Sequence, residues 1–398
     1  MDRPGKFLDA LGQHMTPPDV ARLLASELPS AIEAAIDLAV GDGALLKAVR
    51  QRWPSARAYG IDCDANRLQQ ASSFGKKVRL FHGDGLAGRL PDIRLPGDGR
   101  TAWVGNPPFL AADPDEEHAH WQAQAFPEVN SRHGLRRLEV SFLARALVEA
   151  RKRGAVVAML MPSPFASGVL YAPYRASLAN NYGLRSVVTI EDTRYRRTEA
   201  STVLLVVDTR VSESTRVSIS RYNQTIGKKL LYRGRICPGD RLDAGYWTAI
   251  ELHRSCAPKL ADIGVDVTRG RYCNADAQRR QHRVLHTTDL SRHHGATIEL
   301  PNVSPGHFPA EDVLAETGDI LLSRTGSRVR WEPVVVTAGV APITDHVLRI
   351  RSPQLVREQV ARSFMHPAFP TWLESVTKGV CASVITKREL LQMPVFAA

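Results

Sequence analysis

Residues 106–109, Asn-Pro-Pro-Phe, follow the apolar run at 101–105 and end it. Asn and Pro are common turn formers, and Pro107 favours an extended conformation of Asn106, so one interpretation is a turn at the end of a strand. The alternative is a pocket that holds a planar base and acts on its amino group, because the segment combines an amide, a backbone fixed by proline and an aromatic ring. The surrounding sequence has to decide between the two.

A second candidate segment, Asp-Leu-Ala-Val-Gly-Asp-Gly at 37–43, follows the first apolar run and precedes a helical pattern. Gly41 and Gly43 allow the backbone to turn tightly and to approach a ligand closely. The N-terminus of the next helix favours negative charge, such as a cofactor carboxylate. Such turns are common, and the segment has neither the GxGxxG nor the GxxxxGK[ST] spacing, so by itself it indicates a ligand site only weakly.

Two further acidic residues end the next two apolar runs. Asp62 lies about twenty positions after the glycine turn, where dinucleotide-binding domains hold a pair of ribose hydroxyls. The neighbouring Asp64 has the position of a helix N-cap. Asp84 has two interpretations, a hydrogen bond from an adenine amino group or a simple Asp-Gly turn. Together with Asp37 and Asn106, these residues put polar side chains at four successive strand ends.

The elements that must position these side chains can be read from the apolar runs. We expect strands at 34–40, 55–62, 77–83, 101–105, 154–161, 184–190 and 201–208, and helices at 44–53, 64–74 and 138–154. Apolar runs that alternate with helical patterns predict a doubly wound, mostly parallel, Rossmann-like α/β sheet covered on both faces. Such sheets bind ligands at the carboxyl ends of their strands, where the four polar side chains would lie.

The composition favours a nucleic-acid partner. The chain has 398 residues, enough for two or three domains, and a formal net charge of +11, which suits nucleic acid or an acidic membrane surface. Its five cysteines are dispersed without a Cys-x-x-Cys pair, so neither a disulfide framework nor a metal site is expected. The N-terminus lacks the apolar core of a signal peptide, and the most apolar stretch, 154–170, contains two prolines. We therefore expect a cytoplasmic protein with no membrane segment.

The pattern changes after about residue 210. Residues 221–241 are rich in Arg and Lys, with Gly and Pro among them, and we interpret them as a junction. Beyond it the predicted strands are short, the turns are frequent and the regular alternation of strand and helix is lost. We therefore expect two domains, 1–242 and 243–398, the second smaller and of α+β type.

The order of these motifs resembles that of the gamma class of DNA adenine-N6 methyltransferases. The family's GQ-x-x-TP segment is matched by Gly-Gln-His-Met-Thr-Pro at 12–17, and its DxAxGxG motif by residues 37–43, with Leu38 in place of the usual proline. Its NPP[YF] motif is matched by 106–109, and its PxxF element is similar to Pro-Ser-Pro-Phe at 162–165. The resemblance covers nearly all of residues 10–210.

This resemblance implies a domain that binds S-adenosylmethionine and methylates the exocyclic N6 of a flipped-out adenine, without a metal. The Asn106 side-chain oxygen and the Pro107 carbonyl would accept hydrogen bonds from the target amino group, the prolines would hold these acceptors in place, and Phe109 would stack on the base. The implied catalytic residues are Asn106, Pro107, Pro108 and Phe109. The implied cofactor-binding residues are Thr16, Asp37, Ala39, Gly41, Asp62, Asp84 and Asn106.

The same resemblance implies contacts with DNA. Tyr195 resembles the family's second stacking aromatic, and the adjacent Arg194, Arg196 and Arg197 suit phosphate contacts, although a surface tyrosine and solvated arginines are the alternatives. Residues 243–398 resemble a target-recognition domain of type I restriction specificity subunits, in the stretches 318–327, 343–351 and 377–395. Double-stranded DNA is therefore the expected partner.

The resemblance also implies a prokaryotic, nucleoid-associated enzyme of a restriction-modification or anti-phage system. No nuclease motif is evident, so a restriction endonuclease or other defence subunit would be a separate chain, and a bipartite target site would require a homodimer. Two alternatives stay open, namely the same chemistry on RNA or on protein glutamine, and a non-catalytic DNA-binding specificity subunit. In the first alternative the accessory domain typically precedes the catalytic one, and intact segments at 37–43 and 106–109 disfavour the second.

Overall fold

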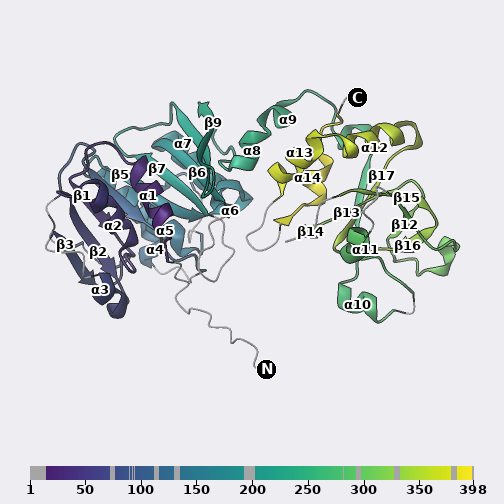
Figure 1. Cartoon of the computed structure of the whole chain (residues 1–398), viewed down its shortest axis with the longest axis horizontal. Coiled ribbons are helices and arrows are strands. Elements are labelled where there is room, and N and C mark those ends of the chain that lie inside the picture. Colours follow the sequence, from purple (N-terminus) through teal and green to yellow (C-terminus); the bar gives the residue numbers. More distant parts are fainter. Residues whose placement is uncertain are drawn as a thin grey trace. The chain divides into compact units, whose positions relative to one another are not determined.

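The computed structural model describes residues 15–71, 77–88, 90, 91, 93, 95–111, 116–129, 135–191, 202–280, 282–292, 297–326, 332–377 and 383–396. The chain divides into two compact units, Met1–Ala244 and Gly245–Ala398 (Figure 1). Among the described helices, none has the length and apolar character required to cross a bilayer.

The first unit is built on a nine-stranded sheet of order β3-β2-β1-β4-β5-β7-β6-β8-β9. Its strands are β1 (Ala34–Asp37), β2 (Arg57–Asp62), β3 (Val78–His82), β4 (Thr101–Gly105), β5 (Val156–Pro162), β6 (Gly183–Glu191), β7 (Thr202–Asp208), β8 (Val217–Asn223) and β9 (Gly227–Gly234). The neighbours from β3 to β5 are parallel, and β7 lies antiparallel between β5 and β6. The predicted doubly wound, mostly parallel sheet is confirmed.

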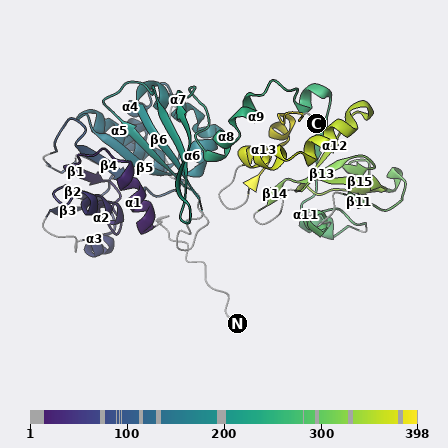
Figure 2. The same ribbon diagram turned by 45° about the horizontal axis from the view of Figure 1, so that its top comes forward.

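Helices cover both faces of this sheet (Figure 2). Helices α1 (Pro18–Glu27), α2 (Ala44–Arg52) and α3 (Ala65–Ala71) lie on one face, and α4 (Glu116–Ala125), α5 (Leu138–Arg151) and α7 (Ala172–Asn181) lie on the other. Strand β4 shows why both faces are apolar. Its Ala102 and Val104 join the core beneath α1 and α2, whereas the intervening Trp103, which is also buried, points to the opposite face.

The interpretation of residues 221–241 as a junction is wrong for much of that segment. Strands β8 and β9 form an antiparallel pair, and β8 extends the sheet in parallel with β6. The basic residues do not preclude a strand, because β9 is an edge strand with exposed side chains, including Lys229 and Arg233, and edge strands commonly carry charge. Part of this charge is neutralised locally, since Lys228 pairs with Glu27.

The second unit contains a five-stranded, mostly antiparallel sheet of order β10-β17-β13-β15-β11, as the α+β prediction required. These strands are β10 (Asp266–Arg269), β11 (Thr297–Glu299), β13 (Ile320–Ser323), β15 (Val334–Ala338) and β17 (Val347–Arg351). Short pairs form between β12 (Leu314–Glu316) and β16 (Val340–Pro342), and between β14 (Thr325–Gly326) and β18 (Ser383–Val384).

The helices of this unit are α8 (Ala244–Thr248), which starts at the unit boundary, α9 (Ile250–Arg254), α10 (Asn274–Gln278), α11 (Thr287–Arg292), α12 (Arg357–Met365), α13 (Ala368–Val376) and α14 (Lys387–Leu391). Helices α12 to α14 contribute to one apolar core with β10, β13 and β17, in which Phe364, Trp372 and Leu390 are buried. A second core gathers residues of β13, β15 and β17 with α11. The sheet is thus apolar on both faces.

Candidate active site

The glycine turn after β1 rests on two residues in left-handed backbone conformations. Gly41 and Gly43 have φ angles of +53° and +79°, a region that favours glycine because it has no Cβ. Gly43 N donates to Val40 O at 2.8 Å, and Ala44 N donates to Asp42 Oδ1 at 3.2 Å. The chain therefore enters α2 directly from the end of β1, with the first N–H groups of the helix at the carboxyl edge of the sheet.

Asp62 joins this turn to the end of β2. Its Oδ2 accepts a hydrogen bond from Gly41 N at 2.7 Å and its Oδ1 accepts one from Asp64 N at 2.9 Å, while the residue is only 5% exposed. Each carboxylate oxygen can accept more than one hydrogen bond, so Asp62 keeps acceptor capacity for a ligand. Asp64 instead accepts from the backbone N–H groups of Asn66 and Arg67, which is the helix-capping role that its position indicated.

Asp37, the last residue of β1, is buried near other carboxylates. Its Oδ1 accepts a hydrogen bond from Ala39 N at 3.0 Å. Burial raises the pKa of Asp37 to about 7; the hydrogen bond from Ala39 opposes this shift, and the charges of Asp62 and Asp42 add to it. A positively charged ligand beside Asp37 would favour its ionised form and would itself be held by it.

The loop after β3 brings a third carboxylate to the same place. Asp84 Oδ1 accepts a hydrogen bond from Leu86 N at 2.8 Å, which closes a side-chain turn. A Cβ added to Gly85 would lie 1.8 Å from Leu38 O, so only glycine lets this loop pack against the glycine turn. Asp84 lines the same pocket as Asp37. It therefore forms the Asp-Gly turn and also lies where it can contact a ligand, so the two interpretations of this residue are compatible.

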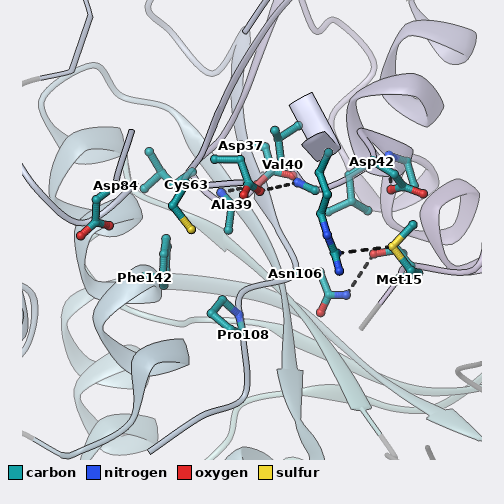
Figure 3. Close-up of a pocket in the computed structure, with 18 residues that line it drawn as sticks. Met15, Asp37, Ala39, Val40, Asp42, Cys63, Asp84, Asn106, Pro108 and Phe142 are labelled. Atoms are coloured by element: carbon teal, nitrogen blue, oxygen red, sulfur yellow. Dashed lines mark hydrogen bonds between the residues drawn. The ribbon is translucent and has the colours of Figure 1, made fainter. Parts of the chain in front are cut away.

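Asn106 follows β4 and is oriented by a residue that precedes α1. Its Nδ2 donates a hydrogen bond to Thr16 Oγ1 at 3.0 Å, and Thr16 is buried. Figure 3 shows Asn106 and Pro108 below Asp37 and Ala39 in the pocket. One N–H of the amide thus faces Thr16, and the carbonyl oxygen is the acceptor end of the same side chain.

The structure brings most of the predicted site residues together. The pocket is lined by Thr16, Asp37, Ala39, Gly41, Asp62, Asp84, Asn106 and Pro108. Pro107 and Phe109 belong to the same loop after β4, but they are not among the described residues that line the pocket. Residues 12–14 of the first motif lie outside the described residues, as do Tyr195, Arg194, Arg196 and Arg197.

Phe142 of α5 is a pocket residue that the sequence pattern does not indicate. It is only 7% exposed, and a Cβ on Gly85 would lie 3.1 Å from its Cε1 atom. An apolar residue inside a predicted helix indicates a core position, and only the packing of α5 against the loop after β3 puts this ring at the pocket. Met15, Cys63 and Arg67 also line the pocket without having been predicted.

The pocket is acidic, and its carboxylates accept hydrogen bonds from the backbone. Asp37, Asp42, Asp62 and Asp84 each accept a hydrogen bond from a nearby backbone N–H group. Across the part of the chain that the structure describes, no group of three or more His, Cys, Asp and Glu side chains could hold a metal ion. This arrangement suits a ligand with hydroxyl or amino donors and a positive charge.

No protein-family model matches the chain, and no protein of curated function matches its sequence significantly. Solved structures do match. The type IIG restriction endonuclease BpuSI has a TM-score of 0.53 and 13% identity, over 96% of this chain and 58% of that chain. A type I restriction-modification methyltransferase subunit from Streptococcus thermophilus has a TM-score of 0.44 and 16% identity, over 54% of this chain and 48% of that one.

A third structure, from Listeria monocytogenes and provisionally assigned to the class I S-adenosylmethionine-dependent methyltransferases, has a TM-score of 0.41 and 19% identity, over 51% of this chain and 62% of that one. This chain therefore spans roughly half to three fifths of the length of these three structures. At these identities the likeness concerns the fold alone: over nearly its whole length, this chain has a fold similar to that of the type IIG restriction endonuclease BpuSI.

Proposed function

We propose that this chain is a site-specific DNA methyltransferase that transfers a methyl group from S-adenosylmethionine to N6 of a flipped-out adenine. The observation that carries the proposal is the convergence of Asn106, held by Thr16, with the three strand-end carboxylates of Asp37, Asp62 and Asp84 in one pocket. The carboxylates suit the cofactor, and the amide suits the target amino group as an acceptor.

The donor set fits S-adenosylmethionine group by group. Asp62, at the end of β2, is the acceptor for the ribose hydroxyls, and Asp84 is the acceptor for the adenine amino group. Asp37 and the other carboxylates favour the positive charges of the sulfonium and ammonium groups. The N-terminus of α2, with Gly43 as its first flanking residue, suits the methionine carboxylate. When bound, the cofactor supplies an electrophilic methyl group.

The loop after β4 would make the target nitrogen reactive. An adenine amino nitrogen is a poor nucleophile because its lone pair is delocalised into the ring. Acceptance of its hydrogens by Asn106 Oδ1 and by the Pro107 carbonyl would favour a tetrahedral nitrogen, and both acceptors are held in place before the base arrives. Phe109 lies in the same loop but outside the cofactor pocket, and on this proposal its ring would stack on the target base.

DNA as the acceptor is supported by the charge of the chain. The formal net charge of +11 favours a polyanion, and the target base must leave the duplex to reach an enclosed pocket.

We assign residues 1–242 to catalysis and 243–398 to target recognition, since a single base pocket cannot read several base pairs. Partners on this proposal are double-stranded DNA, a separate nuclease or defence subunit in the prokaryotic cytoplasm, and a second copy of the chain if the site is bipartite.

Methylation of purified DNA tests the proposal. The full chain should bind S-adenosylmethionine in calorimetry without added metal, and should incorporate tritiated methyl groups into genomic DNA from cells that lack the gene. Mapping of the modified bases should show N6-methyladenine in one sequence context. Transfer to RNA or to protein instead of DNA would favour the alternative acceptors. DNA binding without any cofactor binding would favour a non-catalytic specificity subunit.

A further inference from the structure

The loop after β3 is held by one buried arginine. Arg145 of α5 donates from Nη1 to Gly85 O at 2.9 Å and to Ala87 O at 3.0 Å, and from Nη2 to Gly88 O at 2.9 Å. Its residue is only 1% exposed. Three backbone carbonyls of the loop that carries Asp84 are therefore bound by a single guanidinium group.

This arginine is unusual because its burial is not compensated by an ion pair. Within the described residues, no carboxylate forms a salt bridge with Arg145, and the carbonyl oxygens take that role instead. Its guanidinium carbon lies 4.9 Å from the ring centroid of Trp121, which stacks against it. A buried charge is costly unless it is hydrogen-bonded, so the loop conformation and the arginine conformation depend on each other.

Trp121 adds a fourth contact to the same loop. Its Nε1 donates to Leu86 O at 3.0 Å, and it lies on α4, which packs along α5. The carbonyls of residues 85 to 88 are thus all bound by two side chains, while Asp84 accepts the N–H of Leu86. These contacts fix the loop from its outer side and leave Asp84 at the pocket.

We propose that Arg145, assisted by Trp121, is a positioning residue that sets the base specificity of the cofactor site by holding Asp84 at the adenine amino group. This inference rests on the proposed function. Without Arg145, the loop would lose three of the four side-chain hydrogen bonds described above, and Asp84 would be held less firmly at one position. The contribution of the 6-amino group to cofactor affinity would then fall more than the contributions of the ribose and the amino acid part, which other loops bind.

The helices involved also adjoin the loop after β4. Leu138 N, at the start of α5, donates to Leu110 O at 3.0 Å, one residue after Phe109. Helix α5 therefore contacts both the loop that would hold the cofactor base and the loop that would hold the target base. Because the two loops share this support, a substitution of Arg145 can affect both of them. Its effect on cofactor affinity should therefore be measured first, and its effect on methyl transfer second.

Calorimetry on the full chain with two ligands tests this positioning role. S-adenosylhomocysteine carries a 6-amino group, and S-inosylhomocysteine carries a 6-oxo group that cannot donate to Asp84. The wild type should prefer the first by at least about tenfold, as expected for a hydrogen bond to a charged acceptor. Arg145→Met should reduce the preference to about threefold or less. Arg145→Lys should be intermediate, because one ammonium group retains charge but not the forked geometry.

Arg175 supplies a matched control for the loss of a buried arginine. It is 3% exposed and also binds backbone carbonyls, but those of Phe165 and Gly168 lie in the segment after β5 and that of Asp240 lies after β9. Arg175→Met should lower the melting temperature to a similar degree and leave the adenosyl-to-inosyl preference unchanged. An equal fall of the preference in both variants would overturn the proposal, since a general loss of stability would then explain it.

Trp121→Phe keeps an aromatic ring, removes the hydrogen bond to Leu86 O and reduces the ring surface beside Arg145, so it tests the inference if Arg145→Met does not fold. It should lower the preference partially and leave the melting temperature nearly unchanged. A wild-type preference that persists in folded Arg145 and Trp121 variants overturns the positioning role and leaves the cofactor proposal standing. Failure of the wild type to bind S-adenosylhomocysteine would instead overturn the proposed function itself.

Discussion

Asn106 Nδ2 donates a hydrogen bond of 3.0 Å to Thr16 Oγ1, between residues ninety positions apart in the sequence. The hydroxyl belongs to the segment before α1, and the amide to the loop after β4. In the structure the donor end of the amide faces Thr16, and the hydroxyl acts as the acceptor. The side chain of Asn106 is thus held in part by a residue outside its own loop.

Replacement of Thr16 should disturb catalysis through this hydrogen bond. Thr16→Val keeps the side-chain shape and removes the acceptor, so we expect methyl transfer to fall by roughly two- to tenfold, corresponding to about 0.5–1.5 kcal/mol. Thr16→Ser keeps the hydroxyl and should retain most of the activity. Single-turnover rates at saturating cofactor measure the effect. Equal rates for Thr16→Val and the wild type would show that the contact does not orient Asn106.

Substitution of Asn106 should separate catalysis from cofactor binding. Asn106→Ala removes the proposed acceptor of the target amino group and should abolish methyl transfer, with cofactor affinity nearly intact. Phe109→Ala should lose stacking of roughly 1–3 kcal/mol and leave residual turnover. Incorporation of tritiated methyl groups into DNA and calorimetry with S-adenosylmethionine give the two readouts. Wild-type turnover of the Asn106 variant would mean that the target base binds elsewhere.

Loss of the Asp62 carboxylate should weaken the cofactor. The carboxylate is buried and accepts from Gly41 N, so Asp62→Ala removes both the proposed ribose acceptor and a support of the glycine turn. We expect a loss of roughly 1–3 kcal/mol in binding. Asp64→Ala is the matched control, since Asp64 caps α3 and does not line the pocket. Calorimetry should show a normal affinity for the Asp64 variant; similar losses in both variants would contradict the assignment.

The elevated pKa of Asp37 predicts a pH-dependent gain in stability for Asp37→Asn. The pKa is raised to about 7 in the folded protein, so the wild-type carboxyl favours folding when protonated and progressively loses this advantage as pH rises from about 4 through 7. Asparagine does not ionise. The free energy of unfolding of the variant, relative to the wild type, should therefore rise across this interval, by at most about 4 kcal/mol, and stay level above it.

Urea unfolding at several pH values between 4.5 and 8 measures this difference. The same variant should lose affinity for S-adenosylmethionine, because a negative charge next to a cationic ligand is removed. Parallel stability curves for variant and wild type would show that Asp37 is already ionised across the range.

Exchange of the second unit should exchange the methylated sequence. Reading several base pairs requires side chains in the major groove, where all four pairs differ, and the proposed catalytic unit has one base pocket. A chimera that carries residues 243–398 from a related protein should therefore methylate the relative's site. Sequencing-based mapping of N6-methyladenine in cells checks this. Retention of the parent site by a chimera that is active would assign recognition to the first unit.

The sequence alone determined the alternating strands and helices up to residue 208 and the side chains at the strand ends, but not strands β8 and β9. Apolar runs alternating with helical patterns predict a parallel sheet, and the parallel arrangement brings Asp37, Asp62, Asp84 and Asn106 to one edge. The sequence also implied the tight glycine turn at Gly41 and Gly43, because left-handed conformations depend on local backbone sterics. These features follow from short segments, each of which constrains its own conformation.

The partners of those side chains were decided only by the tertiary structure. Three features join residues from distant segments: the contact of Asn106 with Thr16, the hydrogen bonds of Arg145 to the loop after β3, and the position of Phe142 at the pocket. No local sequence pattern encodes which face of a helix meets which loop. The basic strand β9 resembled a junction for the same reason: an edge strand has only one hydrogen-bonded neighbour, so its side chains need not be apolar. Long-range packing, which depends on the whole chain at once, therefore determined how the predicted residues are oriented.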